Sequence, residues 1–262
     1  MTASEPSTSG FASFAPLVRD RARSGLFVDF DGTLSDIVDD PAAARPHAGA
    51  VDALASLAAV FGRVGVVSGR PIDFLAPFFG DAIALAGLYG LETRVDGVVH
   101  HHPLASSWRE AVQDVATYSV ARGPAGMRVE SKGLSLTLHF RGAPQIEHDV
   151  RAWAQKQAAR SGLVLRGARM SYELHPPIEA DKGTTVIELA DGLTAVAYIG
   201  DDLGDLPAFD GLDVLSTRGV DTVRAAVRSA ELSPRIVERA DVLLDGPAAV
   251  VDVLTRLAST AP

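Results

Sequence analysis

The 262-residue chain contains no cysteine, which excludes disulfide bonds, thiol chemistry and cysteine-ligated zinc sites. It also lacks any apolar run approaching the roughly 18 residues that cross a membrane. Its Ser- and Thr-rich start has neither the basic region nor the apolar region of a signal peptide. We therefore expect a cytoplasmic protein with no membrane partner and with a disordered tail over residues 1–20.

Positive charge is scarce as well, because 24 Lys and Arg residues stand against 33 Asp and Glu residues, giving a net charge of −9 at pH 7. A surface of this kind repels the phosphates of nucleic acids, so no nucleic-acid partner is expected. Apolar residues make up 47% of the sequence, which is ample for the packed core of a globular protein.

Two parts of the chain, residues 21–105 and 176–262, alternate short apolar runs with helical patterns. Such runs, bounded by Gly or Asp, are typical of strands buried on both faces of a parallel sheet. The alternation predicts an α/β fold with a doubly wound parallel-sheet core, whose ligands bind at the carboxyl ends of the strands. The predicted strands span residues 26–30, 64–69, 83–87, 196–200 and 241–245. The predicted helices span residues 50–61, 71–79, 182–191, 222–230 and 248–258.

Residues 106–175 follow a different pattern and predict an inserted α+β domain. Helical segments at 108–121 and 146–160 are each followed by a pair of strands in a hairpin, at 127–141 and 163–175. The resulting order, αββαββ, differs from the βαβ units of the core.

Polar residues of the two hairpins alternate with apolar ones, and side chains two apart share one face of a sheet. An antiparallel sheet ordinarily has one wet face, and the alternative is a polar face that binds a polar ligand. The polar positions are Ser135, Thr137, His139, Arg141, Ser171, Glu173 and His175.

The stretch LFVDFDGTLSDIVDDP places Asp29 and Asp31 at the end of an apolar run. Ionised carboxylates are costly to desolvate, so something must bind at this strand end. A carboxylate there can attack phosphorus and hold a phosphoryl group, and a second one can protonate the leaving oxygen and later deprotonate water.

Phosphate-binding groups follow at two further places. Ser68 ends the second strand, and Pro71 begins a helix with free backbone amides near the serine hydroxyl. Lys182 begins another helix, where the helix dipole disfavours a cation, so its placement calls for a reason beyond that of a surface lysine.

The balance of charge at these strand ends predicts a cofactor. One lysine cannot offset the aspartates at the first strand together with those that follow residues 196–200. A hard divalent cation that binds carboxylate, carbonyl and phosphate oxygens would do so, and Mg²⁺ fits best. The three further carboxylates belong to Asp201, Asp202 and Asp205.

The motifs DFDGTL, VVSGR, DKG and GDDLGD, in this order, resemble the four motifs of the haloacid dehalogenase (HAD) superfamily of phosphatases. The resemblance implies that Asp29 is the nucleophile and a Mg²⁺ ligand, and that Asp31 is the general acid/base and binds the metal through its carbonyl. It implies that Asp201 is a further metal ligand and that the insert is a C2-type cap. It assigns phosphate binding to Ser68 and Lys182, and a supporting metal shell to Asp202 and Asp205.

The segments GLYGLE, VESKGLSLTLHFR and ELHPPIEADKG extend the likeness to the trehalose-6-phosphate phosphatase family, over nearly the whole chain. This resemblance implies Mg²⁺-dependent hydrolysis of a sugar phosphate, trehalose 6-phosphate, by a monomer functionally coupled to trehalose-6-phosphate synthase. The implied substrate-binding residues are Arg70, Glu130, Lys132, His139, Arg141 and Glu173.

Three positions depart from that family's pattern and leave the exact sugar open. Tyr89 stands where the family has His, His175 where it has Arg, and Gly204 where it has Thr. A site built for sugar hydroxyls discriminates through such groups. The alternatives are a phosphatase of sucrose phosphate or mannosyl-3-phosphoglycerate, a phosphomutase or phosphotransferase, and a non-catalytic sugar-phosphate sensor.

Overall fold

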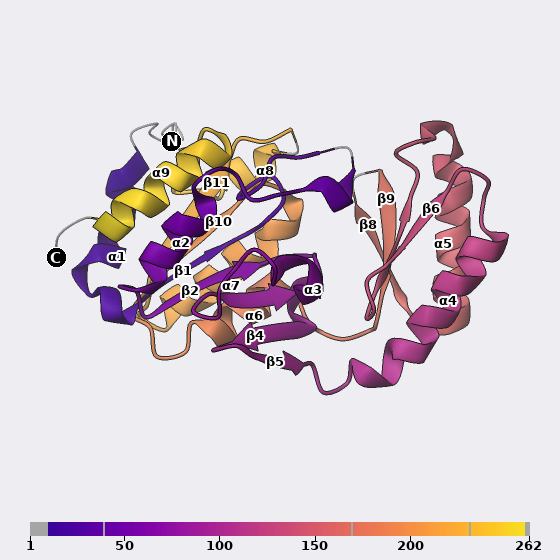
Figure 1. The fold of residues 1–262 in the computed structure, drawn as a ribbon, viewed down its shortest axis with the longest axis horizontal. Helices are drawn as coiled ribbons and strands as arrows, with labels where there is room; N and C mark the ends of the chain where they lie inside the picture. The colour runs from indigo at the N-terminus through magenta and orange to yellow at the C-terminus, as the bar shows by residue number, and fades with distance from the viewer. Residues whose placement is uncertain (1–9, 39, 169, 231, 260–262) are drawn as a thin grey trace. The chain divides into compact units, whose positions relative to one another are not determined.

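The structure is a computed structural model that describes residues 10–38, 40–168, 170–230 and 232–259 (Figure 1). The chain divides into two compact units. The core unit comprises the chain up to His100 together with Ala180 onward, and the cap unit comprises His101–Glu179.

The core unit is built on an eight-stranded sheet in the order β12-β11-β10-β1-β2-β3-β4-β5. Neighbouring strands from β12 to β3 run parallel, and β4 pairs antiparallel with β3. The strands are β1 (Ser24–Val28), β2 (Arg63–Val67), β3 (Ala84–Gly87), β4 (Glu92–Val95), β5 (Val98–His101), β10 (Ala195–Gly200), β11 (Asp221–Val227) and β12 (Val242–Leu244).

Helices cover both faces of this sheet, with α2 (Ala50–Ala58) beside α9 (Gly246–Ser259) on one face and α6 (Lys182–Leu189) beside α7 (Leu206–Thr217) on the other (Figure 1). Successive residues of β1 therefore enter different hydrophobic clusters: Leu26 and Val28 pack with α2 and α9, and Phe27 with α6 and α7. The prediction of strands buried on both faces is confirmed. The shorter helical segments are η1 (Gly10–Phe14), α1 (Ala15–Arg19), η2 (Arg21–Arg23), η3 (Pro41–Ala43), α3 (Ile72–Leu75), η4 (Leu88–Gly90), η7 (Leu203–Asp205) and α8 (Pro234–Val237).

Two expectations for the core were wrong. The predicted helix at 222–230 is strand β11, which pairs on both sides with β10 and β12. Its Ala and Arg residues favour a helix, but two neighbouring strands override that preference. Residues 1–9 of the expected tail lie outside the described residues, whereas residues 10–19 form η1 and α1, because Phe14 and Leu17 are fully buried in the core.

The cap unit contains an antiparallel sheet in the order β6-β7-β9-β8, with two long helices on its apolar face. The elements are η5 (Ser106–Trp108), α4 (Arg109–Arg122), β6 (Arg128–Ser131), β7 (Leu136–His139), η6 (Pro144–Ile146), α5 (Glu147–Ser161), β8 (Val164–Ala168) and β9 (Ser171–His175). This order confirms the predicted αββαββ insert. Leu136 and Leu138 of β7 pack against Val112 of α4 and Val150 of α5.

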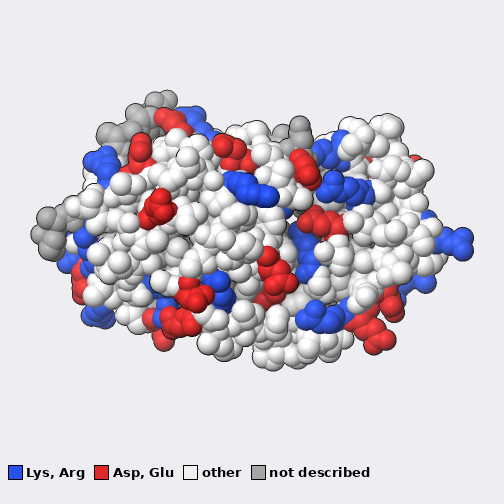
Figure 2. Space-filling model, viewed as in Figure 1, with Lys and Arg blue, Asp and Glu red and all other residues white. Residues whose placement is uncertain are grey.

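On the face shown in Figure 2, acidic and basic side chains lie interspersed, so the excess of 9 negative charges is not gathered into one visible patch there.

We predict that Gly183→Ala destabilises the core unit. A Cβ at this position of α6 would lie 2.2 Å from the carbonyl oxygen of Pro207 in α7, and backbone cannot turn away as a side chain can. The free energy of unfolding should fall by about 1 to 3 kcal/mol, as for other overpacked interiors. Denaturant unfolding measures this loss.

Gly80→Ala is the control for that measurement, because a Cβ at Gly80 has nothing within 4 Å. Equal losses in the two variants would contradict the explanation by close helix packing.

Candidate active site

The candidate catalytic residues gather at one edge of the core sheet, where β10, β1 and β2 end side by side. Asp29 follows β1, Ser68 follows β2 and Asp201 follows β10. The amide of Asp29 donates to the carbonyl oxygen of Ile199 at 2.9 Å, which extends the pairing of β1 with β10 as far as the carboxylate. Parallel strands end at the same edge, so residues far apart in the sequence meet here.

Lys182 supplies the positive charge that this edge requires. It is the first residue of α6, and its Nζ lies 2.8 Å from Oδ1 of Asp29 and 2.6 Å from Oδ1 of Asp205. Its side chain is only 4% exposed, so it is not an ordinary surface lysine. Burial acts to lower the pKa of Lys182, but Asp205 and then Asp29 raise it well above its ordinary value, so the amine stays charged.

Asp205 is fully buried and holds several other groups in place. Besides the Lys182 ammonium, it accepts hydrogen bonds from the hydroxyl of Tyr198 at 2.6 Å and from the amides of Asp201 at 2.8 Å and Asp202 at 3.2 Å. Both oxygens of Asp205 therefore face protein donors. Its carboxylate fixes Lys182 and the turn that follows β10.

Tyr198 is a member of this network that sequence reasoning missed. It lies within β10, in the apolar run predicted at 196–200, and is fully buried. Burial and the neighbouring Asp205 raise the pKa of Tyr198 well above its ordinary value, so the hydroxyl keeps its proton and donates. A buried tyrosine needs a hydrogen-bond partner for its hydroxyl, and this requirement could have indicated from the sequence that Tyr198 belongs to a polar network.

The carboxylates of Asp29, Asp201 and Asp205 form a cluster that suits a metal ion, since each offers an oxygen within 4.8 Å of the others. Oδ2 of Asp201 is buried and accepts no hydrogen bond among the described residues, although Thr33 donates to Oδ1 at 3.3 Å. A buried, unsatisfied carboxylate oxygen is costly unless a cation binds it. The donor set of this cluster therefore fits a hard, oxygen-binding cation.

The turn that follows β1 comes so close to Asp201 that position 32 has no room for a side chain. A Cβ at Gly32 would lie 2.0 Å from Oδ2 of Asp201, and Gly32 has φ of 80°, a conformation that glycine adopts readily.

The carboxylates carry perturbed proton affinities in the metal-free state. Burial raises the pKa of Asp29 well above its ordinary value; Lys182 lowers it, while Asp205 and Asp201 raise it further. Burial, followed by the charge of Asp205, raises the pKa of Asp201 to about 8. A bound divalent cation would favour the ionised forms instead.

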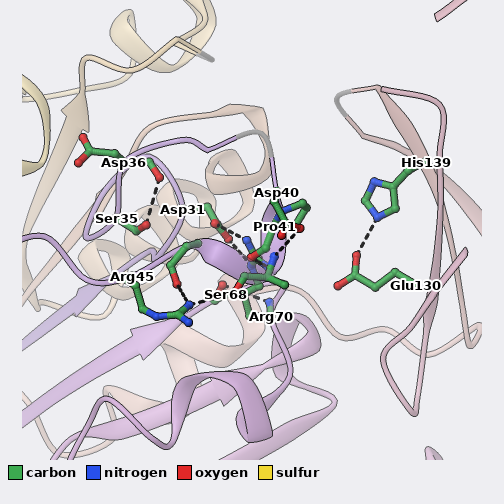
Figure 3. A network of polar contacts seen from close by, with 12 residues as sticks. Asp31, Ser35, Asp36, Asp40, Pro41, Arg45, Ser68, Arg70, Glu130 and His139 are labelled. Carbon is green, nitrogen blue, oxygen red and sulfur yellow. Dashed lines mark hydrogen bonds and ion pairs between the residues drawn. The ribbon is translucent and has the colours of Figure 1, made fainter. Parts of the chain in front are cut away.

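Asp31 lies outside this carboxylate cluster and is bound by Arg70 (Figure 3). Nε of Arg70 donates to Oδ2 of Asp31 and Nη2 donates to Oδ1, both at 2.7 Å. Nη1 of the same arginine donates to the carbonyl oxygen of Pro41 at 2.9 Å. Arg70 was expected to bind substrate, but all three of its guanidinium nitrogens have partners within the protein.

The segment of residues 68–72, which follows β2 and was expected to bind phosphate, differs in detail from its expected form. Ser68 is buried and its Oγ accepts a hydrogen bond from the amide of Arg70 at 3.2 Å. The amide of Ile72, which begins α3, donates to Oε1 of Glu92 at 2.8 Å, so this amide is already occupied. At the other strand end, Asp202 accepts from the amide of Gly204 at 2.8 Å and caps η7.

The structure pairs the expected sugar-binding residues within the cap unit. Nε2 of His139 lies 2.7 Å from Oε2 of Glu130. Nζ of Lys132 lies 3.7 Å from Oε1 of Glu173, which also accepts from Ser135 at 2.8 Å. A further candidate, at the position two residues beyond β7, is the half-buried Arg141.

Two of the departures from the family pattern occupy defined positions. Tyr89 has φ of 59° and packs against Gly69, the residue after Ser68. A Cβ at Gly69 would lie 2.7 Å from the hydroxyl oxygen of Tyr89. His175 ends β9, and its Nδ1 lies 2.8 Å from the carbonyl oxygen of Pro176. Burial and then Arg166 lower the pKa of His175, so the ring is neutral at pH 7.

The sequence model of the trehalose-phosphatase family matches residues 27–235, most of the chain. The chain belongs to the trehalose-phosphatase family. Its curated relatives include trehalose-phosphate phosphatases of Mycobacterium ulcerans (strain Agy99), 36% identical over 90% of this chain and 62% of the relative, and of Mycobacterium avium (strain 104), 37% identical over 89% and 61%. This member of the family thus spans about 62% of the length of such relatives.

Solved structures share the fold. The C-terminal domain of trehalose-6-phosphate phosphatase from Candida albicans superposes with a TM-score of 0.77 at 23% identity, with all of both chains covered. A haloacid dehalogenase-like hydrolase from Bacteroides thetaiotaomicron gives a TM-score of 0.56 at 14% identity, covering 89% of this chain and 98% of its own. The predicted HAD-like α/β core with an inserted cap is confirmed.

The raised pKa of Asp201 predicts that the stability of the protein without a divalent cation depends on pH. Between the ordinary pKa of 3.8 and the folded value of about 8, the folded protein holds a proton here that the unfolded chain releases. Raising the pH through this window therefore lowers the free energy of unfolding. We predict that Asp201→Asn loses less stability than wild type between pH 5 and pH 8, by at least about 1 kcal/mol.

Denaturant unfolding in EDTA at the two pH values measures this difference, and adding Mg²⁺ at pH 8 should stabilise wild type but not Asp201→Asn. A wild-type pH slope in the variant, or equal stabilisation of both by the metal, would contradict the prediction.

Proposed function

We propose that this chain hydrolyses trehalose 6-phosphate to trehalose and inorganic phosphate, with Mg²⁺ as cofactor. The observation that carries the proposal is the buried Asp29 carboxylate beside Lys182, at a strand end that also presents the orphaned oxygen of Asp201. Mycobacterial relatives at 36% and 37% identity are trehalose-phosphate phosphatases, which supports this substrate.

In the proposed reaction, a carboxylate oxygen of Asp29 attacks phosphorus and the bond from phosphorus to the sugar oxygen breaks. Asp31 gives its proton to that oxygen, and an aspartyl phosphate is left on Asp29. Water then attacks the phosphorus while Asp31 takes a proton from it, and phosphate leaves with Asp29 restored. Lys182 and Ser68 bind the phosphoryl oxygens throughout.

The side chains of Asp29 and Asp201 and the carbonyl of Asp31 would hold the Mg²⁺ ion. When bound, it neutralises the carboxylates and the phosphoryl oxygens. Asp205 and Asp202 support this site by fixing the turn after β10.

The cap unit supplies the groups that would recognise the sugar. Glu173 and Lys132 are proposed to form hydrogen bonds with sugar hydroxyls. Hydrogen bonds of this kind discriminate strongly between sugars, which supports a role of both residues in specificity. The full proposed set comprises Glu130, Lys132, His139, Arg141 and Glu173. The full set completes the proposed sugar site.

We further propose that the protein is a cytoplasmic monomer and is functionally coupled to a trehalose-6-phosphate synthase. Among the described residues, every helix is too short or too polar to cross a membrane.

A non-catalytic sugar-phosphate sensor is the alternative of a different class. The C-terminal domain of the trehalose synthase regulatory protein from Candida albicans superposes with a TM-score of 0.69 at 15% identity, covering 95% of this chain and 98% of its own, so the fold alone does not decide. The presence of Asp29, Asp31 and Lys182 favours hydrolysis. Asp31, as an activator of water, favours hydrolysis over phosphoryl transfer to a second sugar.

Asp29→Asn should abolish phosphate release while the protein stays folded, because an amide cannot attack phosphorus. The expected loss in kcat is roughly 10⁴-fold or more, the scale seen when a nucleophile is removed. The measurement is phosphate release from trehalose 6-phosphate with and without Mg²⁺, alongside a thermal melt.

Asp36→Asn is the matched control, since Asp36 belongs to the same loop but pairs with His47 at 3.3 Å and is exposed. Retained activity in Asp29→Asn would rule out Asp29 as nucleophile. Binding without turnover by the wild-type protein would favour the sensor.

Glu173→Gln should affect sugar phosphates and spare small generic esters. We expect kcat/KM for trehalose 6-phosphate to fall about 10- to 100-fold, whereas p-nitrophenyl phosphate, which has no sugar, should change less than about threefold. Steady-state kinetics on a panel that includes sucrose 6-phosphate, glucose 6-phosphate and mannosyl-3-phosphoglycerate also identify the preferred sugar. Equal losses on both kinds of substrate would show that Glu173 does not recognise the sugar.

A further inference from the structure

Arg70 ties together three segments of the core unit (Figure 3). Its guanidinium donates to both oxygens of Asp31, in the turn after β1, and to the carbonyl oxygen of Pro41, which begins η3. Its own backbone amide donates to Ser68 at the end of β2. Arg70 therefore links the carboxylate of Asp31, the expected general acid/base, to the segment that follows β2.

Packing restricts the arginine further. The guanidinium carbon lies 4.5 Å from the centre of the Phe74 ring, and Phe74 is itself in edge contact with Phe30 at 5.7 Å. The Arg70 side chain is 11% exposed. A planar guanidinium held by an aromatic face, a carbonyl and a carboxylate has little rotational freedom, and the position of Asp31 is fixed along with it.

Asp31 remains able to reach a substrate from this position. Its side chain is 35% exposed, in contrast to the 8% exposure of the Asp29 side chain. Arg70 donates one hydrogen bond to each oxygen, and a carboxylate has about four lone-pair sites, so further sites stay open for a proton.

We propose that Arg70 is the positioning residue for Asp31, and that it acts on the reaction through this carboxylate rather than by contact with the phosphoryl group. This inference rests on the proposed function, in which Asp31 protonates the leaving sugar oxygen. It replaces the direct substrate contact expected for Arg70 from the family resemblance.

The two roles differ in their dependence on the leaving group. A sugar oxygen is a poor leaving group and needs a proton as it departs, whereas dinitrophenolate leaves without one. Loss of a phosphate contact would weaken hydrolysis of both esters, because both carry the same phosphoryl group. Loss of a positioned acid would weaken only the first.

The test compares kcat/KM of wild type and Arg70→Met on trehalose 6-phosphate and on 2,4-dinitrophenyl phosphate, because kcat/KM excludes the later hydrolysis of the phosphoenzyme. Methionine keeps an unbranched stem over Phe74 and removes the fork. We expect about a 100-fold loss on the sugar phosphate, within the range of general acid catalysis, and less than about a threefold loss on the aryl phosphate. Equal losses on the two esters, or no loss on either, would overturn the proposal.

Arg45→Met is the matched control. Arg45 also packs on a phenylalanine, 5.6 Å from the centre of Phe78, and donates to the carbonyl oxygens of Ala42 and Ala44 in the same loop. Among the described residues it makes no hydrogen bond to Asp31. This variant should leave both kcat/KM values within about threefold of wild type.

A double-mutant cycle separates this inference from the proposed function. If Arg70 acts through Asp31, Arg70→Met should add less than about threefold to the loss in an Asp31→Asn background. Full additivity would overturn the proposal. If Asp31→Asn itself shows no dependence on the leaving group, the assigned role of Asp31 fails; if it does and Arg70→Met does not, only the positioning role fails.

Melting temperatures show whether each variant folds. If Arg70→Met does not fold, Arg70→Lys takes its place, because lysine keeps the charge but cannot make the paired hydrogen bonds. The same preference for the aryl ester is expected, and its absence would equally overturn the proposal.

Discussion

The burial of several carboxylates around a single ammonium group is the constraint on which the rest of the site depends. Lys182 lies between Asp29 and Asp205 with almost no exposure, and removing one partner of a buried ion pair leaves an uncompensated charge. Asp205 in turn accepts hydrogen bonds from Tyr198 and from two backbone amides, which fixes the turn that carries Asp201. Oδ2 of Asp201 is buried and has no hydrogen-bond partner in the part of the chain that the structure describes, so it is suited to bind a cation.

Much of the fold could be predicted because buried strands of a parallel sheet have a plain signature. Residues 26–28 and 196–199 are apolar, and their alternate side chains pack against the helices on the two faces of the sheet. Residues 222–230 have no such signature. Their strand conformation depends on backbone partners in β10 and β12, which a local pattern does not contain.

The site divides in the same way. Asp29 and Lys182 could be predicted because charge at a strand end or a helix start needs a local explanation. The fork between Arg70 and Asp31 joins residues 39 positions apart, and the direction of an arginine side chain is set by packing on Phe74. Tyr198 was hidden for the opposite reason, since an aromatic ring suits a buried strand whether or not its hydroxyl has a partner.

The insertion of the cap unit between β5 and α6 has a consequence for how the protein folds. Strand β1 lies between β2 and β10, and its partner Ala195 is 171 positions after Ser24. During synthesis the whole cap unit is made after β1 and before β10, so one edge of β1 has no strand to pair with during that interval. Such long-range closure slows folding and leaves an aggregation-prone edge, which makes the joining of β10 to β1 the late and vulnerable step in assembly of the core.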